Sequence, residues 1–350
     1  MSETSLMSPD AILAARAERP KLRARDLAAA LGVPEAALVA AETGRAATRI
    51  AAHPNALMPA VTELGEVMAL TRNESAVHER VGSYLEYHPG EHATMVLGPE
   101  IDLRMFPKHW AHAFAVTEET EAGVRRSLQV FDAAGDAVHK VHLKPASDVA
   151  AFDRLVATLA TGDENRGFDA APRTPPEGAW IREDKIDILR KEWERMTDTH
   201  QFLRLVSKLK MNRLGAYRAA GAPYAEPLAP EAVSAMLERS AAEGIEIMLF
   251  VGNPGCIQIH AGTIHTLTPM GPWQNVMDPR FNLHLRADHV AEVWRVWKPT
   301  RRGPAISVEA FDEEGRLILQ CFGKRKEAEP VAWNAMVAEL APAETAEATA

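Results

Sequence analysis

Cysteine is scarce in this chain, and so are long apolar runs. Only Cys256 and Cys321 occur, far apart and without metal-site spacing, which argues against a disulfide scaffold and a thiolate-bound zinc ion. The longest apolar runs, such as 247–251, are far too short to span a bilayer. The opening MSETSLMSPDAIL has neither the basic nor the apolar region of a secretory signal. We therefore expect a cytoplasmic protein with no membrane insertion.

Positive charge is also in short supply. The chain has 39 Lys and Arg residues against 48 Asp and Glu residues, a formal net charge of -9 at pH 7. This balance argues against nucleic acid or an anionic membrane as a general partner. An anionic ligand would therefore need basic side chains gathered locally. With 350 residues, 47% of them hydrophobic, the chain is long enough to form two domains.

The stretch 9–50 is rich in alanine and is predicted to be helical. Its segment RDLAAALGVPEAALVAAETG has a helical apolar period, a Gly-Val break and a proline at a helix start. Because this is also the outline of a helix-turn-helix, a DNA-associated regulator is an alternative function. The segment that would read DNA, PEAALVAAET, has no Arg or Lys to meet phosphates or bases. A packing segment of short helices is the favoured interpretation.

From about residue 60 the sequence repeats itself. IDLRMFPKHWAHAFAV, from Ile101, aligns with FNLHLRADHVAEVWRV, from Phe281. SLQVFDAAGDAVHKVHLKP, from Ser127, aligns with SVEAFDEEGRLILQCFGKR, from Ser307, at the same spacing along the chain and without a gap. The residues that recur identically are Leu103, His109, Ala111, Val116, Ser127, Phe131, Asp132, Gly135 and Lys144. Such a pattern indicates a tandem duplication of one domain.

The duplication leads to a prediction of fold and domains. AISVEAF and RLILQCF alternate between apolar and polar residues on either side of the turn DEEG, which predicts a hairpin in each repeat. We predict an α+β fold, a tandem duplication of an antiparallel sheet flanked by helices. The N-terminal repeat is expected at 1–170, the C-terminal repeat at 180–340, and a disordered tail at 341–350. The proline-rich stretch 170–180 is the expected connection.

One histidine stands out within KIDILRKEWERMTDTHQFLRLVSKLKM, from Lys185. Proline is absent between Pro176 and Pro223, so a long helix is permitted. Steps of three and four positions place an apolar stripe on one helix face, made of Leu189, Trp193, Met196, His200, Leu203 and Val206. His200 is then either a core histidine or an axial ligand to a metal, and the pattern alone favours the core histidine.

The repeats differ in their chemistry. Aligning LTRNE (70–74) with MTDTH (196–200) places Glu74 opposite His200, so only the second repeat would carry the imidazole. At the spacing that aligns Ile101 with Phe281, the basic groups also differ: Lys298 replaces Glu118, Arg325 replaces Pro145, and His284 replaces Arg104. One working site with a supporting second copy would produce these differences, and so would neutral drift of surface residues.

Several long motifs resemble the bacterial HemS/HmuS-type haemin-degrading and haem-trafficking factors. They are TDTHQF around His200, GPEIDLRMF around Arg104, GNPGCIQIHAG from Gly252, and the ending KPT…FGKR. The resemblance implies a protein of iron acquisition that receives haem b delivered into the cytoplasm. Its implied partners are the cytoplasmic face of a haem ABC transporter and a haem oxygenase, with no nucleic acid. Whether the chain also opens the ring itself, as an enzyme using an external reductant, stays open.

The resemblance also implies roles for particular residues. His200 matches the axial ligand of the haem iron, and Arg104 matches an arginine on the distal side, the one candidate catalytic group. The other matching haem contacts are Phe106, Arg213, Phe250, Lys298, Gln320 and Arg325, of which the two phenylalanines line the ring, and Lys298 and Arg325 face the propionates. Phe322 stands where the family has a tyrosine, so a hydroxyl is missing while apolar contact remains.

The chemistry of haem agrees with these residue types. Haem iron accepts a neutral imidazole, the macrocycle needs apolar walls, and the two propionates need Arg or Lys. In IDLRMF, strand alternation places Arg104 and Phe106 on the face opposite Leu103 and Met105. A single strand can therefore offer a cation and an aromatic ring to one site.

Overall fold

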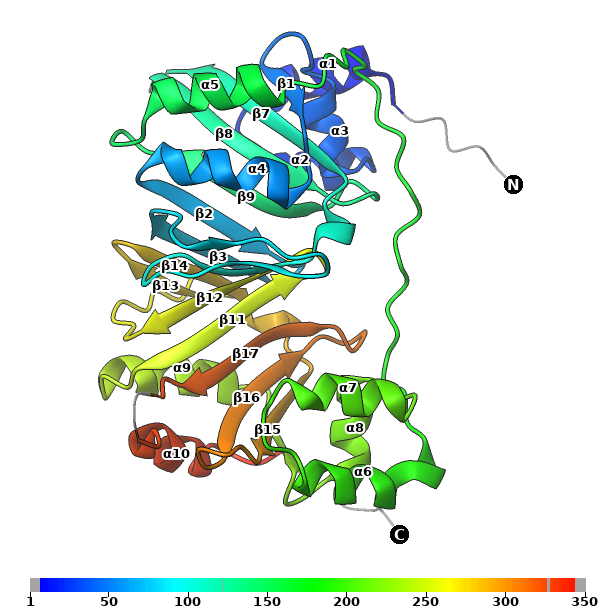
Figure 1. Cartoon of the computed structure of the whole chain (residues 1–350), viewed down its shortest axis with the longest axis vertical. Coiled ribbons are helices and arrows are strands. Elements are labelled where there is room, and N and C mark those ends of the chain that lie inside the picture. Colours follow the sequence, from blue (N-terminus) through cyan, green and yellow to red (C-terminus); the bar gives the residue numbers. More distant parts are fainter. Residues whose placement is uncertain (1–6, 122, 326–327, 344–350) are drawn as a thin grey trace. The chain divides into compact units, whose positions relative to one another are not determined.

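The computed structural model describes residues 7–121, 123–325 and 328–343 (Figure 1). The chain divides into two compact units. Unit 1 consists of Met1–Arg72, His78–Thr174 and Gly252–Gln258, and unit 2 consists of Asn73–Val77, Pro175–Val251 and Ile259–Ala350. No helix of the described residues is both long and apolar enough to cross a membrane.

Unit 1 begins with three short helices and continues into an antiparallel sheet. Its helices are α1 (Pro9–Glu18), α2 (Ala24–Leu31), α3 (Glu35–Ala40), α4 (Pro54–Val61) and α5 (Val149–Leu159). Its strands are β1 (Ala47–Ile50), β2 (Val67–Arg72), β3 (Ala76–Gly82), β4 (Tyr87–His88), β5 (Thr94–Val96), β6 (Asp102–Met105), β7 (His112–Thr120), β8 (Gly123–Phe131) and β9 (Ala137–Leu143). Five strands are hydrogen-bonded in the order β1-β7-β8-β9-β2, every neighbouring pair being antiparallel.

Unit 2 repeats this plan. Its helices are α6 (Ile186–Glu194), α7 (Gln201–Lys208), α8 (Arg213–Ala220), α9 (Ala232–Ala242) and α10 (Val331–Ala338). Its strands are β10 (Ala225–Leu228), β11 (Ile247–Asn253), β12 (Cys256–Gly262), β13 (Trp273–Asp278), β14 (Phe281–Arg286), β15 (Glu292–Lys298), β16 (Ala305–Phe311) and β17 (Leu317–Gly323). The corresponding order is β10-β15-β16-β17-β11, again antiparallel throughout.

The structure confirms the duplication and the α+β fold. Strand β17 begins and ends where the spacing between the sequence repeats places the counterpart of β9, and β12 stands in the same relation to β3. Both predicted hairpins are present, and each has a register irregularity at the same point, Val130/Phe131 and Ala310/Phe311. A bulge retained in both copies is a structural feature of the original domain rather than an accident of one copy.

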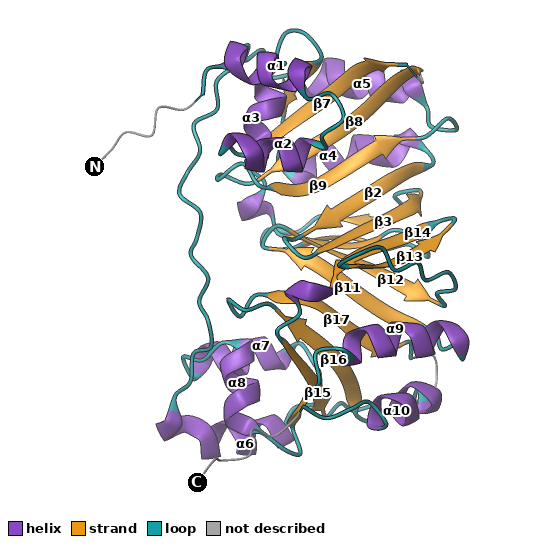
Figure 2. Ribbon diagram, turned by 180° about the vertical axis from the view of Figure 1, so that it is seen from behind, coloured by secondary structure: helices purple, strands orange, loops and turns teal. Residues whose placement is uncertain are grey.

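Each sheet is covered by helices on both faces (Figure 2). In β7, Ala113 and Ala115 pack with α4 and α5, whereas Phe114 and Val116 pack with α1, α2 and α3. The side chains of β15 in unit 2 also pack on both faces of their sheet. Val293 lies in the α9–α10 core, whereas Trp294 and Val296 lie in the α6–α8 core. Strands buried on both faces lose the simple alternation of apolar and polar residues, which is what these segments show.

The three-helix segments that open the units correspond element by element. Helix α2 matches α7, and α3 matches α8. The alignment of Glu74 with His200 is therefore wrong: Glu74 lies in the β2–β3 turn, whose counterpart is the β11–β12 turn, and His200 matches Arg23. Both His200 and Arg23 are the residue just before a helix begins. Repeated elements are thus aligned by their place in the fold, which a five-letter match cannot supply.

The segment predicted as helical, 9–50, forms α1, α2 and α3 but ends in the strand β1. Gly32 adopts a left-handed conformation, φ 65°, and ends α2 at the predicted Gly-Val break. Every residue of α3 is buried, Glu35 included. Since α3 is the helix that would have to enter a DNA groove, the alternative of a helix-turn-helix regulator is not supported.

The connecting stretch has no regular secondary structure, whereas the C-terminal end pairs with a strand. Residues 170–180 contain no helix or strand, and the division between the units falls between Thr174 and Pro175. Of the tail expected to be disordered, 344–350 lie outside the described residues. Residues 341–343 are ordered, however, because Pro342 bridges Leu228. Pairing with the edge strand β10 holds this short piece in place.

Candidate functional site

His200 lies in a turn between two helices and not within one long helix. Helix α6 ends at Glu194 and α7 begins at Gln201. Two side chains bond the backbone of the turn: Asp198 Oδ1 accepts from the His200 N–H at 2.8 Å, and Gln201 Oε1 accepts from the Thr197 N–H at 2.8 Å. Such local side-chain bonds compete with helical hydrogen bonds, and here they interrupt the helix that the apolar period predicted.

The prediction that His200 belongs to an apolar stripe is therefore wrong. The side chain of His200 is 89% exposed, whereas Leu189, Trp193, Met196 and Val206 are buried. The ring of Phe202, which follows closely in the chain, enters the core instead and packs on Trp193 at 4.7 Å between ring centroids. The break in the helix rotates His200 out of the core, so the imidazole is available to a ligand.

Asp198 holds the ring of His200 as well as its backbone. Its Oδ1 lies 2.7 Å from Nδ1 of His200. A carboxylate can only accept a hydrogen bond, so Nδ1 carries a proton, and in the neutral imidazole Nε2 then keeps a free lone pair. Among the residues that the structure describes, Nε2 of His200 has no hydrogen-bond partner. The backbone N–H and the ring of His200 lower the pKa of Asp198.

Phe250, Gln320 and Phe322 come together on one face of the unit 2 sheet. Phe250 of β11 is paired with Gln320 of β17, and Met248 is paired with Phe322. The rings of Phe250 and Phe322 meet edge to face, with centroids 5.5 Å apart. All three side chains are half-buried, while Leu249 and Cys321 between them are buried on the opposite face. This face offers two aromatic rings beside an amide.

The half-buried Arg213 and the buried Lys298 surround one carboxylate. Arg213 Nη1 donates to Glu309 Oε2 at 2.8 Å, and Lys298 Nζ donates to Glu309 Oε1 at 2.8 Å. The hydroxyl of Tyr217 also donates to Glu309, at 2.8 Å. Burial alone would raise the pKa of Glu309, but the two cations outweigh it and hold that pKa well below its usual range. Burial lowers the pKa of Lys298.

These contacts give Arg213 and Lys298 an internal partner that the sequence did not reveal. Lys298 was expected at the haem propionates and Arg213 as a further haem contact, and in the structure each is paired with Glu309. Arg325 follows β17, and its guanidinium donates to the backbone carbonyls of Arg302 and Pro304, the latter at 2.7 Å. It is partly exposed and pairs with no carboxylate among the described residues.

Arg104 and Phe106 belong to unit 1, whereas the other expected site residues belong to unit 2. The predicted alternation is confirmed, with Leu103 and Met105 buried and Arg104 partly exposed. Arg104 pairs with Asp102 on the same face of β6 and donates to the Leu103 carbonyl at 3.0 Å. Phe106 lies just beyond the end of β6 and is half-buried.

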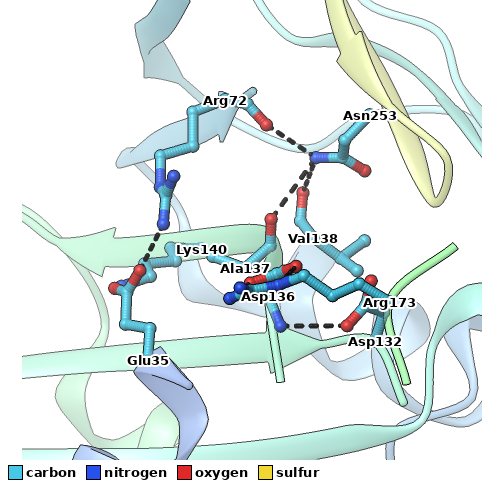
Figure 3. A network of polar contacts seen from close by, with 9 residues as sticks. All are labelled: Glu35, Arg72, Asp132, Asp136, Ala137, Val138, Lys140, Arg173 and Asn253. Carbon is cyan, nitrogen blue, oxygen red and sulfur yellow. Dashed lines mark hydrogen bonds and ion pairs between the residues drawn. The ribbon is translucent and has the colours of Figure 1, made fainter. Parts of the chain in front are cut away.

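Unit 1 has a buried ion cluster of its own (Figure 3). Glu35 of α3 pairs with Arg72 of β2 and with Lys140 of β9. Burial would raise the pKa of Glu35, but the charges of Lys140 and Arg72 lower it to about 2. Nearby, the Asn253 side chain donates to the backbone carbonyls of Arg72 and Val138, at 2.9 Å each.

Two features of the site were missed at the sequence level. Asp198 stands just before His200 in the polar run TDTHQ, a composition typical of a turn that could have signalled the break. Glu309 is a lone acid in the strand AISVEAF, and its partner Arg213 lies far away in the sequence. Among the described residues, no group of three or more His, Cys, Asp or Glu side chains could hold a metal ion.

Comparison with known proteins identifies close relatives. The model of the haemin-degrading HemS/ChuX domain matches the chain twice, at residues 32–159 and 210–340. The hemin transport protein HmuS of Yersinia pestis is 40% identical over 329 residues, which cover 93% of this chain and 95% of that protein.

Two solved structures are similar over nearly the whole chain. That of holo-PhuS, a heme-binding protein from Pseudomonas aeruginosa, has a TM-score of 0.91 and 43% identity, covering 96% of this chain and all of that one. That of the heme-degrading enzyme ChuS of Escherichia coli O157:H7 has a TM-score of 0.86 and 34% identity, covering 94% and 97%.

Proposed function

Because the chain belongs to the haemin-degrading HemS/ChuX family, we propose that it binds haem through Nε2 of His200 and either passes the haem on or opens its ring. The observation that carries this proposal is the state of His200: an exposed imidazole whose Nδ1 is already bonded to Asp198. A haem-iron ligand needs a neutral imidazole with one free nitrogen and a partner for the other.

Unit 2 also offers groups that suit a flat apolar ligand with two anionic groups, and we propose that they line the same site. Phe250 and Phe322 supply aromatic surface on the sheet of unit 2, and Gln320 supplies a polar group beside them. Arg325 follows β17 and has no carboxylate partner among the described residues, and we propose that it contacts a propionate directly. Lys298 and Arg213 outnumber Glu309 by one charge, so we propose that they attract the propionates at longer range without leaving their partner.

Arg104 and Phe106 complete the proposal from unit 1. Arg104 would stand on the distal side, where its guanidinium can donate hydrogen bonds to a ligand or an ordered water. Phe106 would add an aromatic wall. When bound, haem itself supplies the redox chemistry, and the chain orients the ring, excludes bulk water and places donors around it.

Two uses of this site are proposed side by side. As a carrier in the cytoplasm, the chain would receive haem at an ABC transporter and hand it to a haem oxygenase, and a single protein ligand would make release easy. As an enzyme, it would hold haem while an external reductant and oxygen degrade it. Phe322 in place of a tyrosine leaves one hydroxyl fewer near the ring, which favours the carrier.

The proposal is tested by titrating haemin into the wild-type protein, His200→Ala and the control His265→Ala, followed by absorbance. His265 is an exposed histidine of the same unit, held by Thr263. We expect a one-to-one Soret shift in the wild type and the control, and its loss or displacement in His200→Ala. Identical spectra for all three proteins would refute the assignment of the ligand.

The two uses are separated by adding ascorbate to the haem complex in the presence of catalase. Bleaching of the Soret band would establish an enzyme, because catalase removes free peroxide. A stable spectrum, followed by transfer of haem to added apo-haem oxygenase, would establish a carrier.

A further inference from the structure

We infer that Asp198 is a positioning residue that fixes the tautomer of His200 and makes it a stronger ligand for ferric than for ferrous haem. This inference rests on the proposed function, since it concerns how His200 would bind the iron. It begins from one atom: Oδ1 of Asp198 accepts from both the backbone N–H and Nδ1 of His200, at 2.8 Å and 2.7 Å.

The two bonds place the ring before any ligand arrives. The bond to the backbone N–H holds Asp198 and His200 in one tight turn, and the bond to Nδ1 then fixes the orientation of the imidazole. Because Asp198 lies at the N-terminal end of α7, the helix dipole further stabilises its negative charge. The proton is thereby kept on Nδ1, and Nε2 is left as the donor atom.

A charged hydrogen-bond acceptor at Nδ1 makes the imidazole a stronger metal ligand than a neutral acceptor does. A carboxylate that accepts from Nδ1–H draws the proton toward itself and increases the electron density on Nε2. This density stabilises the more highly charged ferric iron more than the ferrous iron. Reduction of the bound haem would therefore weaken its hold on His200, which links the redox state of the cargo to its release.

The corresponding turn of unit 1 lacks both groups. When α2 is aligned with α7 from their first residues, Lys21 stands in the place of Asp198 and Arg23 in the place of His200. The pair of acid and imidazole therefore belongs to unit 2 alone. A turn that needed the acid only for its own shape would not require the acid and the imidazole to occur together.

The first test needs no haem. In the ¹⁵N-labelled apo protein, long-range ¹H–¹⁵N correlations report which ring nitrogen of His200 is protonated. We expect the Nδ1–H tautomer in the wild type and an increased share of Nε2–H in Asp198→Ala. A wild-type His200 protonated mainly at Nε2 would overturn the inference, whatever the haem titrations show.

The second test compares Asp198→Asn with the control Asp187→Asn. An Asn side chain keeps an oxygen for the His200 N–H and removes only the charge, and Asp187 is an exposed acid of α6. We expect Asp198→Asn to weaken ferric haem binding about tenfold and ferrous binding less, so the midpoint potential becomes more positive. A fivefold to tenfold change in the ratio of the two affinities corresponds to about 40–60 mV.

Three results are distinguished by these measurements. A potential unchanged from that of Asp187→Asn would overturn the inference while leaving His200 as the ligand. If His200→Ala binds haem with the wild-type spectrum, the proposed function fails at its ligand, and the potential of Asp198→Asn should then also be unchanged. A positive shift together with a lower frequency of the iron–histidine stretch in the ferrous complex supports the inference.

Discussion

The two units bury the same kind of ion cluster with opposite polarity. In unit 1 the third helix contributes the anion, Glu35, and the strands contribute the cations. In unit 2 the third helix contributes a cation, Arg213, and the strand β16 contributes the anion, Glu309. Glu35 and Arg213 occupy the same place, the first residue of α3 and of α8. What the copies share is a charge pair that joins the third helix to the sheet, not the residues that make it.

The reversal has a physical consequence. A negative side chain in the first turn of a helix interacts favourably with the helix dipole, and a positive one does not. Glu35 is therefore partly stabilised by its own helix, whereas Arg213 depends on Glu309. Glu309 is fully buried and is the only carboxylate bonded to Arg213 and Lys298 among the described residues. Loss of the anion should therefore lower the free energy of unfolding more in unit 2 than in unit 1.

Removal of the anion from unit 2 should give the largest effect. Glu309→Gln leaves the buried Lys298 and the half-buried Arg213 without their carboxylate and should lower the free energy of unfolding by about 3–5 kcal/mol. Urea unfolding followed by tryptophan fluorescence measures it, because Trp193 and Trp294 pack beside this cluster. The exposed control Glu314→Gln should change the stability by about 0.5 kcal/mol or less. Equal effects of the two substitutions would contradict the comparison.

Removal of the anion from unit 1 should cost less. Glu35→Gln should destabilise by about 2–3 kcal/mol, since Lys140 is 10% exposed against 3% for Lys298, and Glu35 is 6% exposed whereas Glu309 is fully buried. The pKa of Glu35 is lowered from 4.5 to about 2, so its contribution is present above pH 4.5 and is lost as the pH falls toward 2. Calorimetry from pH 7 to pH 2.5 should show the wild-type and variant unfolding temperatures converging. A difference in unfolding temperature that stays constant with pH would show that the negative charge of Glu35 does not contribute to stability.

Removal of one cation should have an intermediate effect in both units. Lys298→Met leaves Glu309 paired with Arg213, and Lys140→Met leaves Glu35 paired with Arg72. Each remaining pair is neutral overall, so we expect a loss of about 1–2 kcal/mol in either case. Thermal unfolding of the two variants measures it. A loss as large as that of Glu309→Gln would mean that the lysine, and not the neutral pair, holds the cluster together.

The smallest effect concerns a glycine that only unit 2 has. A Cβ on Gly215 would lie 1.9 Å from the backbone oxygen of Trp180, whereas the same place in α3 is taken by Ala37. Gly215→Ala should therefore displace the segment at Trp180 at a cost of about 1 kcal/mol. Faster trypsin cleavage after Arg182 reports the displacement, with Ala37→Gly as the matched control. An unchanged rate of cleavage would show that the segment at Trp180 keeps its position without a glycine at position 215.

The repeats and hairpins could be predicted from the sequence because a fixed spacing and a twofold alternation are signals that the sequence carries directly. AISVEAF and RLILQCF formed the predicted hairpin, and IDLRMF kept its alternation. The break in the helix before His200 could not be predicted, because side-chain bonds to Asp198 and Gln201 override the apolar period. These bonds depend on the conformation of the turn, which periodicity does not describe.

The acidic partner of the basic residues could not be predicted from the sequence either. Lys298 and Arg213 were identified as cations without a visible anion, and Glu309 reaches them only after β15, β16 and α8 have packed. A resemblance to a family can name the residues near a ligand. Which of them are already neutralised within the fold depends on long-range contacts.

The central claim is that one unit alone carries a haem ligand, His200 at the turn where unit 1 has Arg23. Native mass spectrometry of the haemin complex tests this most directly, because it counts the haem molecules on each chain. We predict one haem for the wild type, and for His200→Ala either no haem or a haem that is lost at a lower desolvation energy. Two haem molecules on the wild type, or one that His200→Ala retains as firmly as the wild type does, would contradict the claim and point to a ligand elsewhere in the chain.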